Sequence, residues 1–402
     1  MTKCVLGDVA DVIISGVDKK TKDGEERVRL CNYTDVYYNW AITGDKHDGL
    51  MEASAKPEEI RKFKIRKGQV ALTKDSETRD DIGIPTYIAD DFEDVILGYH
   101  CALITPHGKQ LDGSYLNALL RTKYAKEFFA NNAGGSGQRY YLSEASIREL
   151  PLFLPDVAEQ KRIGKFLSSI DRKIALNRKR IATLEAMAKE IYDYWFVQFD
   201  FPNAHGRPYK SSGGAMVYNP DLKREIPKGW EVVRIGDVLD RHILSTNKIP
   251  AKAYGQFGAY PIIDQSEKFI AGYTDDKNAI LDYPFCTVFG DHSCELKAVN
   301  FPFARGADGT QIVVSADANV PNVQLYFALR MMDFGGGYKR HFVLAKDSLI
   351  VKDAIGVAAP RFEKVEKAIF DGIKHCRFEN FKLTGLRDFL LPVLMNGQVK
   401  VR

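Results

Sequence analysis

The chain has 402 residues, 45% hydrophobic and 27% charged, which excludes a disordered protein and predicts more than one compact domain. Lysine and arginine number 57 against 53 aspartates and glutamates, and the formal charge of +4 permits a nucleic-acid partner without requiring one. The apolar runs are too short to cross a bilayer, the N-terminal residues lack a signal-peptide pattern and the six cysteines form no CxxC pair, so we expect a cytoplasmic protein with reduced thiols and no membrane segment.

Residues 1–155 have the pattern of a mixed α and β domain. Glycine, proline and aspartate break short alternating segments, which predicts many short strands, as at residues 69–73, 86–89 and 95–105. A helix-like stretch follows at residues 114–131. The polar segment LTKDSETRDD contains Lys74 and Arg79, which either contact DNA or belong to an ordinary surface loop.

A glycine-rich basic loop closes this first part of the chain. Its sequence, GGSGQRYY, places Gln138 and Arg139 directly before Tyr140 and Tyr141. Glycine lets the backbone approach phosphates, and arginine and glutamine side chains can form bidentate hydrogen bonds with base edges. We therefore expect these four residues to contact DNA. The alternative is a solvated loop that only ends a helix.

Residues 156–199 are expected to form a long amphipathic helix, from about Glu159 to Trp195. Asp156 is the expected N-cap, with Glu159 at the third helical position. Apolar residues recur at alternating steps of four and three, which indicates a coiled-coil seam rather than an ordinary core helix. The seam consists of Ile163, Leu167, Ile170, Ile174, Asn177, Ile181, Leu184 and Ile191.

The remainder of the chain repeats this layout. Residues 200–228 are rich in Pro, Gly, Ser and Asn, which predicts a surface linker. A second domain of the same kind as the first is expected at residues 229–358. Two sequence phrases return in the same order, which indicates a duplicated domain. The phrases are LGDVAD, which returns as IGDVLD from Ile235, and AGGSGQRYYL, which returns as FGGGYKRHFV from Phe334.

The second loop adds Lys339, Arg340 and His341 to the expected DNA contacts, because it matches the first loop in basic and aromatic content.

Residues 359–402 carry the second long helix, expected at about residues 361–394. Its seam changes phase near Leu383, and Pro392 predicts a late kink. Counted from the proline near the start of each helix, this helix is expected to be shortened or irregular relative to the first. Its expected interface residues are Ile369, Ile373, Asn380, Leu383, Leu386 and Leu390.

The sequence contains no recognisable motif for catalysis or cofactor binding. It lacks a P-loop, a dinucleotide-binding fingerprint and the Asn-Pro-Pro-aromatic loop of an amino-methyltransferase. The nuclease-like set Pro155-Asp156 with Glu159-Gln160-Lys161 lies within one helical turn, whereas such metal sites use adjacent strands. Cys286, His292 and Cys294 lack a fourth zinc ligand. We therefore expect no catalytic residue, no metal and no cofactor.

Four segments resemble the specificity (S) subunits of type I restriction–modification systems. The segment LPLFLPDVAEQKRIGKFLSSIDRKIALNRKRIATLE from Leu150 is similar to the family's conserved helix. The pair YWFVQFDFP and EIPKGWEVVRIGDV resembles its junction into the second half, and LRDFLLPVLMNGQV resembles its C-terminus. The resemblance covers nearly the whole chain. It departs at the start of the second helix, VAAPRFEKVEKAIF, which lacks the Pro-Glu-Gln form of the first.

The resemblance implies an α+β fold with two similar target-recognition domains and two long helices in an antiparallel coiled coil, related by a pseudo-twofold repeat. It implies a non-catalytic subunit whose domains each read half of a split double-stranded DNA site. Its helices would act as a spacer and dock two methyltransferase (modification) subunits, with restriction subunits in the same complex. The alternatives are a stand-alone DNA methyltransferase or nuclease, and an architectural or regulatory coiled-coil protein.

Two polar residues fall in the expected seam of such a helix pair. We hypothesise that Asn177 and Asn380 approach each other across the interface, where a buried asparagine can fix the register. The alternative is that each asparagine faces solvent at an irregularity of the seam.

Overall fold

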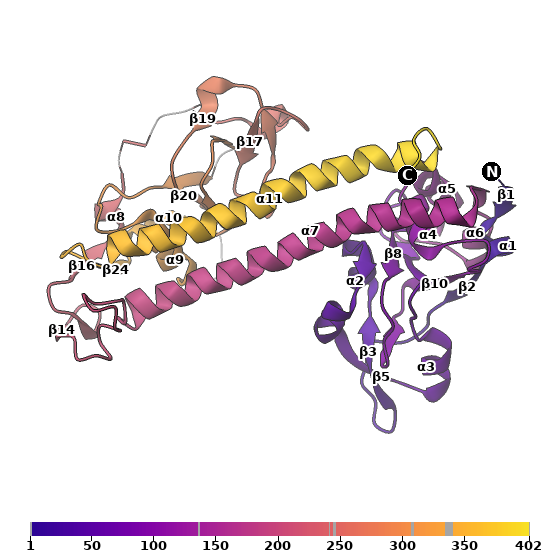
Figure 1. Cartoon of the computed structure of the whole chain (residues 1–402), viewed down its shortest axis with the longest axis horizontal. Helices are drawn as coiled ribbons and strands as arrows, with labels where there is room; N and C mark the ends of the chain where they lie inside the picture. Colours follow the sequence, from indigo (N-terminus) through magenta and orange to yellow (C-terminus); the bar gives the residue numbers. More distant parts are fainter. Residues whose placement is uncertain are drawn as a thin grey trace. The chain divides into compact units, whose positions relative to one another are not determined.

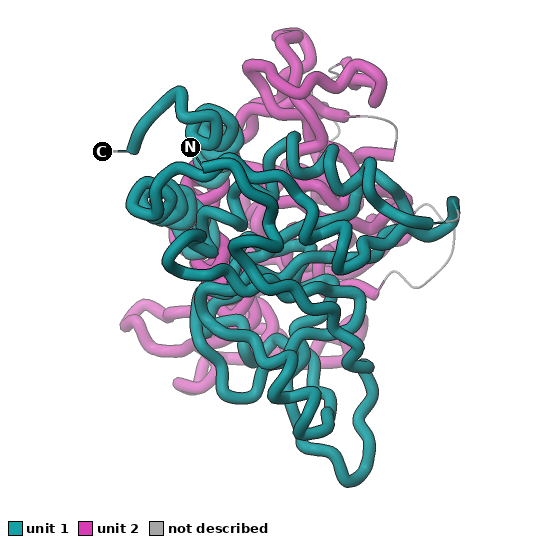
Figure 2. The backbone as a smooth tube through the Cα atoms, turned by 90° about the vertical axis from the view of Figure 1, so that its right-hand side faces the viewer, with its two compact units in different colours: residues 1–176, 380–402 teal, residues 177–379 magenta. Residues whose placement is uncertain are grey.

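The computed structural model describes residues 2–135, 137–240, 242–243, 247–306, 309–333 and 341–401. Figure 1 labels the helices and strands. The chain divides into two compact units, coloured separately in Figure 2: unit 1 comprises residues 1–176 and 380–402, and unit 2 comprises residues 177–379. The long helices α7 (Val157–Tyr192) and α11 (Ala359–Met395) contribute to both units.

Among the described residues, unit 1 contains three sheets of three or more strands. The largest has the order β2 (Ala10–Ile14), β10 (Cys101–Pro106), β6 (Val70–Thr73), β8 (Pro85–Ile88) and β4 (Ala41–Ile42). A second has the order β5 (Met51–Ala55), β3 (Glu26–Cys31) and β9 (Val95–Leu97). The third has the order β11 (Gly134–Gly135), β12 (Tyr140–Tyr141) and β7 (Asp75–Ser76).

The helices of unit 1 differ in one respect from the sequence expectation. The stretch expected as one helix forms two, α4 (Gly113–Leu120) and α5 (Lys123–Asn132), because the Thr122 side chain caps the second by accepting a hydrogen bond from the Ala125 amide. The other short helices are α1 (Leu6–Val9), α2 (Tyr33–Tyr38), α3 (Pro57–Phe63) and α6 (Glu144–Arg148).

Unit 2 contains two sheets of comparable size. One has the order β18 (Gly272–Thr274), β17 (Tyr260–Ile263), β22 (Phe303–Arg305) and β19 (Ile280–Leu281). The other has the order β21 (Leu296–Val299), β20 (Cys286–Gly290) and β23 (Thr310–Val313). Its short helices include α8 (Ile235–Val238), α9 (Asn322–Arg330) and α10 (His341–Asp347).

The expected linker is built into unit 2 instead of forming a free connection. Its residues include the hairpin of β14 (Met216–Asn219) and β15 (Arg224–Pro227). Phe201 and Ile226 are buried in the same core as Trp230. The aromatic and aliphatic residues of this segment therefore outweigh its glycine and serine content, because their burial stabilises an ordered path.

The duplication visible in the sequence is a duplication of structure. In unit 1, β1 (Thr2–Val5) pairs antiparallel with β13 (Pro151–Leu154), the strand that leads into α7. In unit 2, β16 (Glu231–Arg234) pairs antiparallel with β24 (Leu349–Lys352), which leads into α11. The same backbone hydrogen bond follows each pair, from Leu6 N to Leu150 O at 2.9 Å and from Ile235 N to Ser348 O at 3.0 Å.

The two long helices pack together in antiparallel fashion within each unit. In unit 1, Leu167 of α7 shares a core with Leu394 near the end of α11. In unit 2, Tyr192 at the end of α7 lies 6.4 Å, ring centroid to ring centroid, from Phe362 near the start of α11. Ion pairs reinforce both contacts, between Asp171 and Arg387 in unit 1 (3.7 Å) and between Glu185 and Arg377 in unit 2 (2.8 Å).

The predicted seam of α7 faces these cores. Ile163, Leu167, Ile170, Ile174 and Asn177 are buried, and Ile181, Leu184 and Ile191 are partly buried against the core of unit 2. On α11, Ile369 and Ile373 are buried, and Leu383 and Leu390 are half-buried. The expected place of Leu386 in the seam is wrong. This side chain is 45% exposed and lies outside the seam, because the apolar pattern has changed phase by that point.

The start of α7 follows the sequence expectation. Asp156 precedes the first helical residue, and its side chain accepts a hydrogen bond from the Glu159 amide at 2.8 Å. Gln160 is fully buried; it accepts a hydrogen bond from the Asp112 amide and donates to the carbonyls of Gln110 and Pro155. The nuclease-like set of acidic residues therefore acts as a helix start.

Helix α11 is not shortened, contrary to the sequence expectation. It has 37 residues against 36 for α7, and Pro392 lies inside it. The start of α11 is held by a residue at a different position from the one that caps α7. The buried Asp353 carboxylate accepts hydrogen bonds from the amides of Ala358 and Ala359 at 2.6 and 2.9 Å. Helix α11 begins one residue before Pro360 and continues through Pro392 to Met395, so the expected shortening does not arise at its start.

A buried carboxylate lies in the helix interface of unit 2. Glu366 has no exposed surface, and neither carboxylate oxygen has a hydrogen-bond partner in the part of the chain that the structure describes. It lies one turn from Phe362 and one turn from Phe370, both members of the aromatic core. Burial raises the pKa of Glu366 to about 8, from an ordinary value of 4.5.

We expect the thermal unfolding midpoint to fall as the pH rises from 5 to 8, because the folded chain keeps the Glu366 proton where the unfolded chain has lost it. Replacing Glu366 by glutamine should flatten this dependence and raise the midpoint at pH 8. Glu363→Gln, a change at an exposed residue of the same helix, is the control. An unchanged pH profile in Glu366→Gln would show that this carboxylate is ionised in the folded chain.

Candidate DNA interface

Strand pairing brings together residues that lie far apart in the sequence of unit 1. β12 pairs antiparallel with β7, with Tyr140 opposite Ser76 and Tyr141 opposite Asp75. Arg79 follows β7, and its guanidinium carbon lies 5.1 Å from the Tyr140 ring centroid. We call this group the β7–β12 cluster; it comprises Lys74, Asp75, Arg79, Tyr99, His100, Tyr140 and Tyr141.

The glycine-rich loop is the tip of a hairpin between β11 and β12. At Gly135 the φ angle is +152°, and a Cβ atom there would lie 2.2 Å from the Arg139 carbonyl oxygen, so the hairpin requires glycine. Gln138 and Arg139 are exposed at this tip. Glycine thus shapes the hairpin, and Gln138 and Arg139 expose their side chains to an external partner.

Lys74 has a different setting from the one expected. Its side chain is only 13% exposed, its ammonium group lies 2.8 Å from the Asp75 carboxylate, and it sits 5.2 Å from the Tyr99 ring centroid. Its backbone links two neighbours, donating to His100 O at 2.9 Å and accepting from Leu142 N at 2.7 Å. The structure therefore makes Lys74 a supporting residue of the cluster more than a freely exposed cation.

His100 completes the cluster. Its Nδ1 lies 2.6 Å from the same Asp75 carboxylate oxygen that Lys74 contacts, and its ring packs edge-on against Tyr99, with centroids 4.1 Å apart. His100 also has a φ of 73°, which is unusual for any residue other than glycine. The sequence analysis missed Asp75, Tyr99 and His100, because only the folded chain brings them beside Tyr140 and Tyr141.

A second aromatic group, on α2, contacts Asp81, which lies two residues after Arg79. The Tyr37 hydroxyl donates a hydrogen bond to the Asp81 carboxylate at 2.7 Å, and this bond raises the pKa of Tyr37 to about 12. Tyr37 stacks on Tyr33 at a centroid distance of 5.7 Å, and Tyr38 is largely exposed. Residues 78–81 are therefore tied to α2, which limits their freedom.

The second predicted loop is only partly described. Lys339 and Arg340 lie outside the described residues. His341 is 2% exposed, and its backbone amide donates a hydrogen bond to the Asp291 carbonyl at 3.3 Å. The equivalent bond in unit 1 runs from the Leu142 amide to the Lys74 carbonyl. The structure thus places His341 opposite the buried Leu142, not opposite Tyr140, so it belongs to the core of unit 2 and not to an exposed DNA-contacting loop.

The expected seam asparagines each contact the other long helix. In unit 2 the Asn177 amide donates to the Glu379 carboxylate at 2.7 Å, and in unit 1 the Asn380 amide donates to the Ile174 carbonyl at 3.4 Å. Both polar groups therefore find partners in the helix pair. The direct approach of the two amides stays a prediction.

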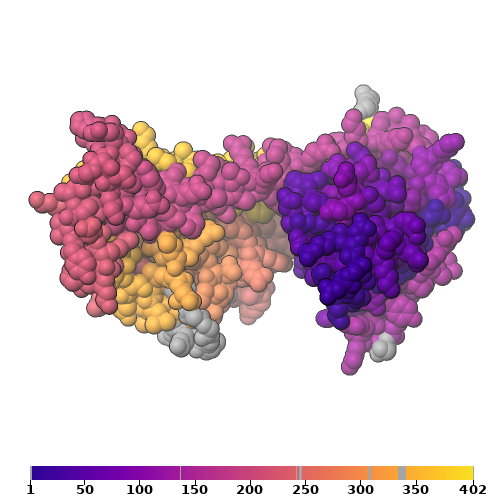
Figure 3. Space-filling model, turned by 90° about the horizontal axis from the view of Figure 1, so that it is seen from below, coloured from indigo at the N-terminus to yellow at the C-terminus, as the bar shows by residue number. Residues whose placement is uncertain are grey.

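The long helices also present apolar side chains to the outside. The exposed members are Leu176 and Met187 on α7 and Val365, Phe381, Leu386 and Phe389 on α11, of which Phe389 is 68% exposed. Figure 3 shows α7 at the surface in that view.

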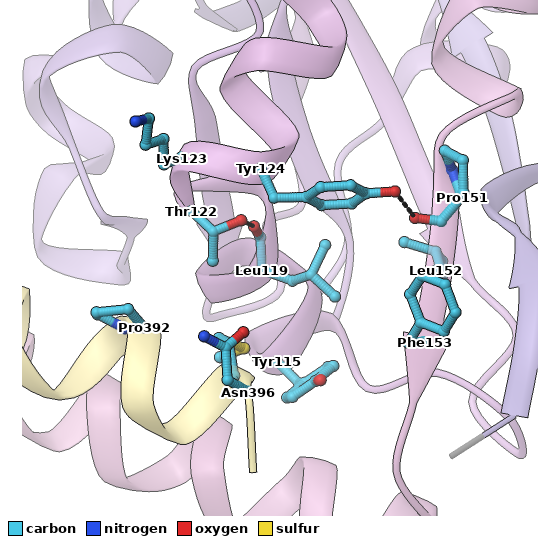
Figure 4. A pocket seen from close by; sticks show the side chains of 11 residues that line it. Tyr115, Leu119, Thr122, Lys123, Tyr124, Pro151, Leu152, Phe153, Pro392 and Asn396 are labelled. Atoms are coloured by element: carbon cyan, nitrogen blue, oxygen red, sulfur yellow. Dashed lines mark hydrogen bonds between the residues drawn. The ribbon is translucent and has the colours of Figure 1, made fainter. Parts of the chain in front are cut away.

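Each unit has a pocket at the matching place of the repeat. In unit 1 it has a volume of about 450 Å³ and lies between α4, α5, β13 and the end of α11 (Figure 4). In unit 2 it lies between α9, β24 and the end of α7. Leu222 and Arg224, from the segment expected as a linker, also line this second pocket. The Arg224 side chain donates hydrogen bonds to the carbonyls of Phe196 and Val197 at 3.3 Å.

The described residues contain no group of three or more His, Cys, Asp or Glu side chains arranged to hold a metal ion. Within the same residues, no helix combines the length and apolar character needed to span a membrane. Cys286 and Cys294 carry free thiols, and burial raises the pKa of both.

Known proteins show the same organisation. Residues 2–186 match the family model described as type I restriction modification DNA specificity domain. The chain is 36% identical over 125 residues to the type I restriction enzyme MjaIX specificity subunit of Methanocaldococcus jannaschii, covering 31% of this chain and 27% of that relative. It is 23% identical over 425 residues to the putative MjaX specificity subunit of the same organism, covering 99% and 93% of the two chains.

The fold agrees with these likenesses. The crystal structure of the type I restriction–modification S subunit from M. genitalium superposes with a TM-score of 0.56 at 14% identity, covering 98% of this chain and 95% of that one. The family match covers residues 2–186, which include most of α7, and the alignment with MjaX extends over both units. Residues 2–186 are therefore similar to the type I restriction modification DNA specificity domain, and the chain is similar over almost its whole length to a putative specificity subunit.

Proposed function

We propose that this chain reads a split double-stranded DNA target, with one recognition domain in each unit, as the non-catalytic DNA-binding subunit of its complex. The β7–β12 cluster carries this proposal for unit 1. Its members Arg79, Tyr140 and Tyr141 lie at the base of the hairpin whose tip exposes Gln138 and Arg139. Such side chains supply bidentate contacts to bases, charge for phosphates and flat apolar surface.

The long helices supply the second part of the proposed function. Their exposed apolar side chains offer a docking surface for methyltransferase subunits, of which we propose two because the fold is duplicated. Restriction subunits would join the same complex. The chain needs no cofactor in this role and would act in the cytoplasm. The acidic set at the start of α7 supports no nuclease, since Asp156 and Glu159 are engaged in the helix start and in an ion pair with Arg162.

Reconstitution tests this function directly. The purified chain alone should transfer no methyl group to DNA and should cut no DNA. Together with its methyltransferase subunits, it should direct methylation to a target made of two separated half-sites. Methyl transfer or cleavage by the purified chain alone would contradict the non-catalytic role, and methylation without sequence preference would contradict the reading role.

Arg139→Ala tests the hairpin tip. We expect the reconstituted complex to lose about 1–3 kcal/mol of binding and to relax its preference in one half-site only, if this side chain reads a base. An equal loss on all DNA sequences would indicate a phosphate contact instead. Lys123→Ala is the control, because this lysine is exposed on α5 away from the hairpin. Equal binding by Arg139→Ala and the parent chain would remove the hairpin from the interface.

The helix pair is expected to set the spacing of the half-sites. Helix α7 has 36 residues, about 54 Å at 1.5 Å per residue, against about 34–36 Å between half-sites one DNA turn apart. One heptad inserted after residue 176 and another after residue 379, at the borders of the units, would add about 10 Å.

The methylated target should then gain roughly three base pairs of unread DNA at ~3.4 Å each, with both half-site sequences unchanged. A control chain with the heptad in only one helix should lose activity, because the seam would be out of register. New half-site sequences at the old spacing would show that these helices do not determine the gap.

A further inference from the structure

We propose that His100 determines specificity in unit 1 by accepting a hydrogen bond from the exocyclic amino group of adenine or cytosine in the major groove. The inference deepens the DNA-reading function proposed above and rests on it. It arises from three observations: the backbone conformation of His100, the fixed orientation of its ring and its position beside β12. None of them is visible in the amino-acid sequence.

The backbone at His100 has the left-handed conformation, with a φ of 73°. The matching turn in unit 2 shows which residue this backbone conformation favours. Lys74 N donates to His100 O at 2.9 Å in unit 1, and Asp291 N donates to Gly309 O at 2.7 Å in unit 2. Gly309 has a φ of 83°. The same turn is therefore made by glycine in one unit and by histidine in the other.

Strand register supports this equivalence. Cys101 after His100 pairs with Thr73, and Thr310 after Gly309 pairs with Gly290, in the same antiparallel geometry. A left-handed conformation costs roughly 1–2 kcal/mol for a residue with a Cβ atom and little for glycine. The turn alone favours glycine, so the left-handed histidine points to a role for the imidazole side chain.

The ring of His100 is oriented by Asp75. An ionised carboxylate accepts hydrogen bonds and donates none, so Nδ1 carries the proton that Asp75 accepts at 2.6 Å. The Lys74 ammonium group holds the same carboxylate oxygen at 2.8 Å. In the neutral ring Nε2 is then an acceptor, and no hydrogen bond joins it to any residue within the described ranges.

The position of His100 places this acceptor beside the expected DNA contacts. Asp75 lies opposite Tyr141 in the β7–β12 pairing, and Tyr99, which is exposed, packs edge-on against the imidazole. The His100 side chain is about one-third exposed, at 32%. A single oriented acceptor can distinguish adenine and cytosine, whose amino groups face the major groove, from guanine and thymine, which present acceptors there.

The test replaces His100 by glycine, the residue at the matching place in unit 2. His100→Gly should keep or raise the thermal unfolding midpoint, because it removes the unfavourable backbone conformation. In the reconstituted complex, it should reduce discrimination at one base pair of one half-site by roughly 5- to 150-fold. A purely structural histidine would instead lower stability or weaken binding to all sequences equally.

Further variants keep the test decisive. His100→Asn tolerates the left-handed backbone and keeps a polar side chain, so it covers the case in which His100→Gly fails to fold. Asp75→Asn should weaken the same discrimination, because it disturbs the ring orientation. His107→Ala is the matched control, since His107 lies 3.3 Å from the Asp11 carboxylate on the surface of the same unit.

The outcomes separate this inference from the function on which it rests. Unchanged discrimination at every base pair in His100→Gly, with a sequence-specific parent complex, overturns the role of His100 and leaves the proposed function standing. A parent complex without sequence preference overturns the proposed function itself. A uniform loss of affinity in His100→Gly also overturns the inference, because it would show a contact that reads no base.

Discussion

The antiparallel strand pairs β1–β13 and β16–β24 determine the architecture of this protein. Each pair ties a strand near the start of one repeat of the fold to the strand that leads into a long helix. A hydrogen bond from the next residue, Leu6 in unit 1 and Ile235 in unit 2, extends each pair. The direction in which each helix leaves its domain thus follows from backbone hydrogen bonds, which tolerate wide variation of the side chains. Recognition surfaces can therefore diverge while the frame that carries them stays constant.

Periodicity and capping made much of this frame predictable. The seam of α7, from Ile163 to Asn177, is buried as expected, and Asp156 caps the helix. Two expectations failed. Helix α11 continues through Pro392 to Met395 and has 37 residues, so it is not shortened relative to α7. The segment after α7 looked like a linker because its glycines and serines are frequent, yet Phe201 and Ile226 anchor it in a core.

The candidate DNA interface was predictable only in part, for a similar reason. Arginine, glutamine and tyrosine beside glycines are informative locally, and β7–β12 pairing does bring Arg79 to Tyr140. Matching the two loops by sequence set His341 opposite Tyr140, whereas hydrogen bonding sets it opposite Leu142 in the interior. His100 carried no local signal at all, because its interest comes from a backbone angle and from the glycine at the matching position.

The division of the long helices between the units has a consequence for how the chain acquires its structure. Unit 1 contains both the first 176 residues and the last 23, residues 380–402, and Leu394 is buried in its core. During synthesis, the first domain therefore emerges long before the segment that completes its interior. Joining the two segments requires closure of a loop of about 200 residues, which is slow compared with local contacts. Until residues 380–402 reach this core, the apolar side chains that Leu394 contacts there lack one of their partners, and exposed apolar surface of this kind favours aggregation.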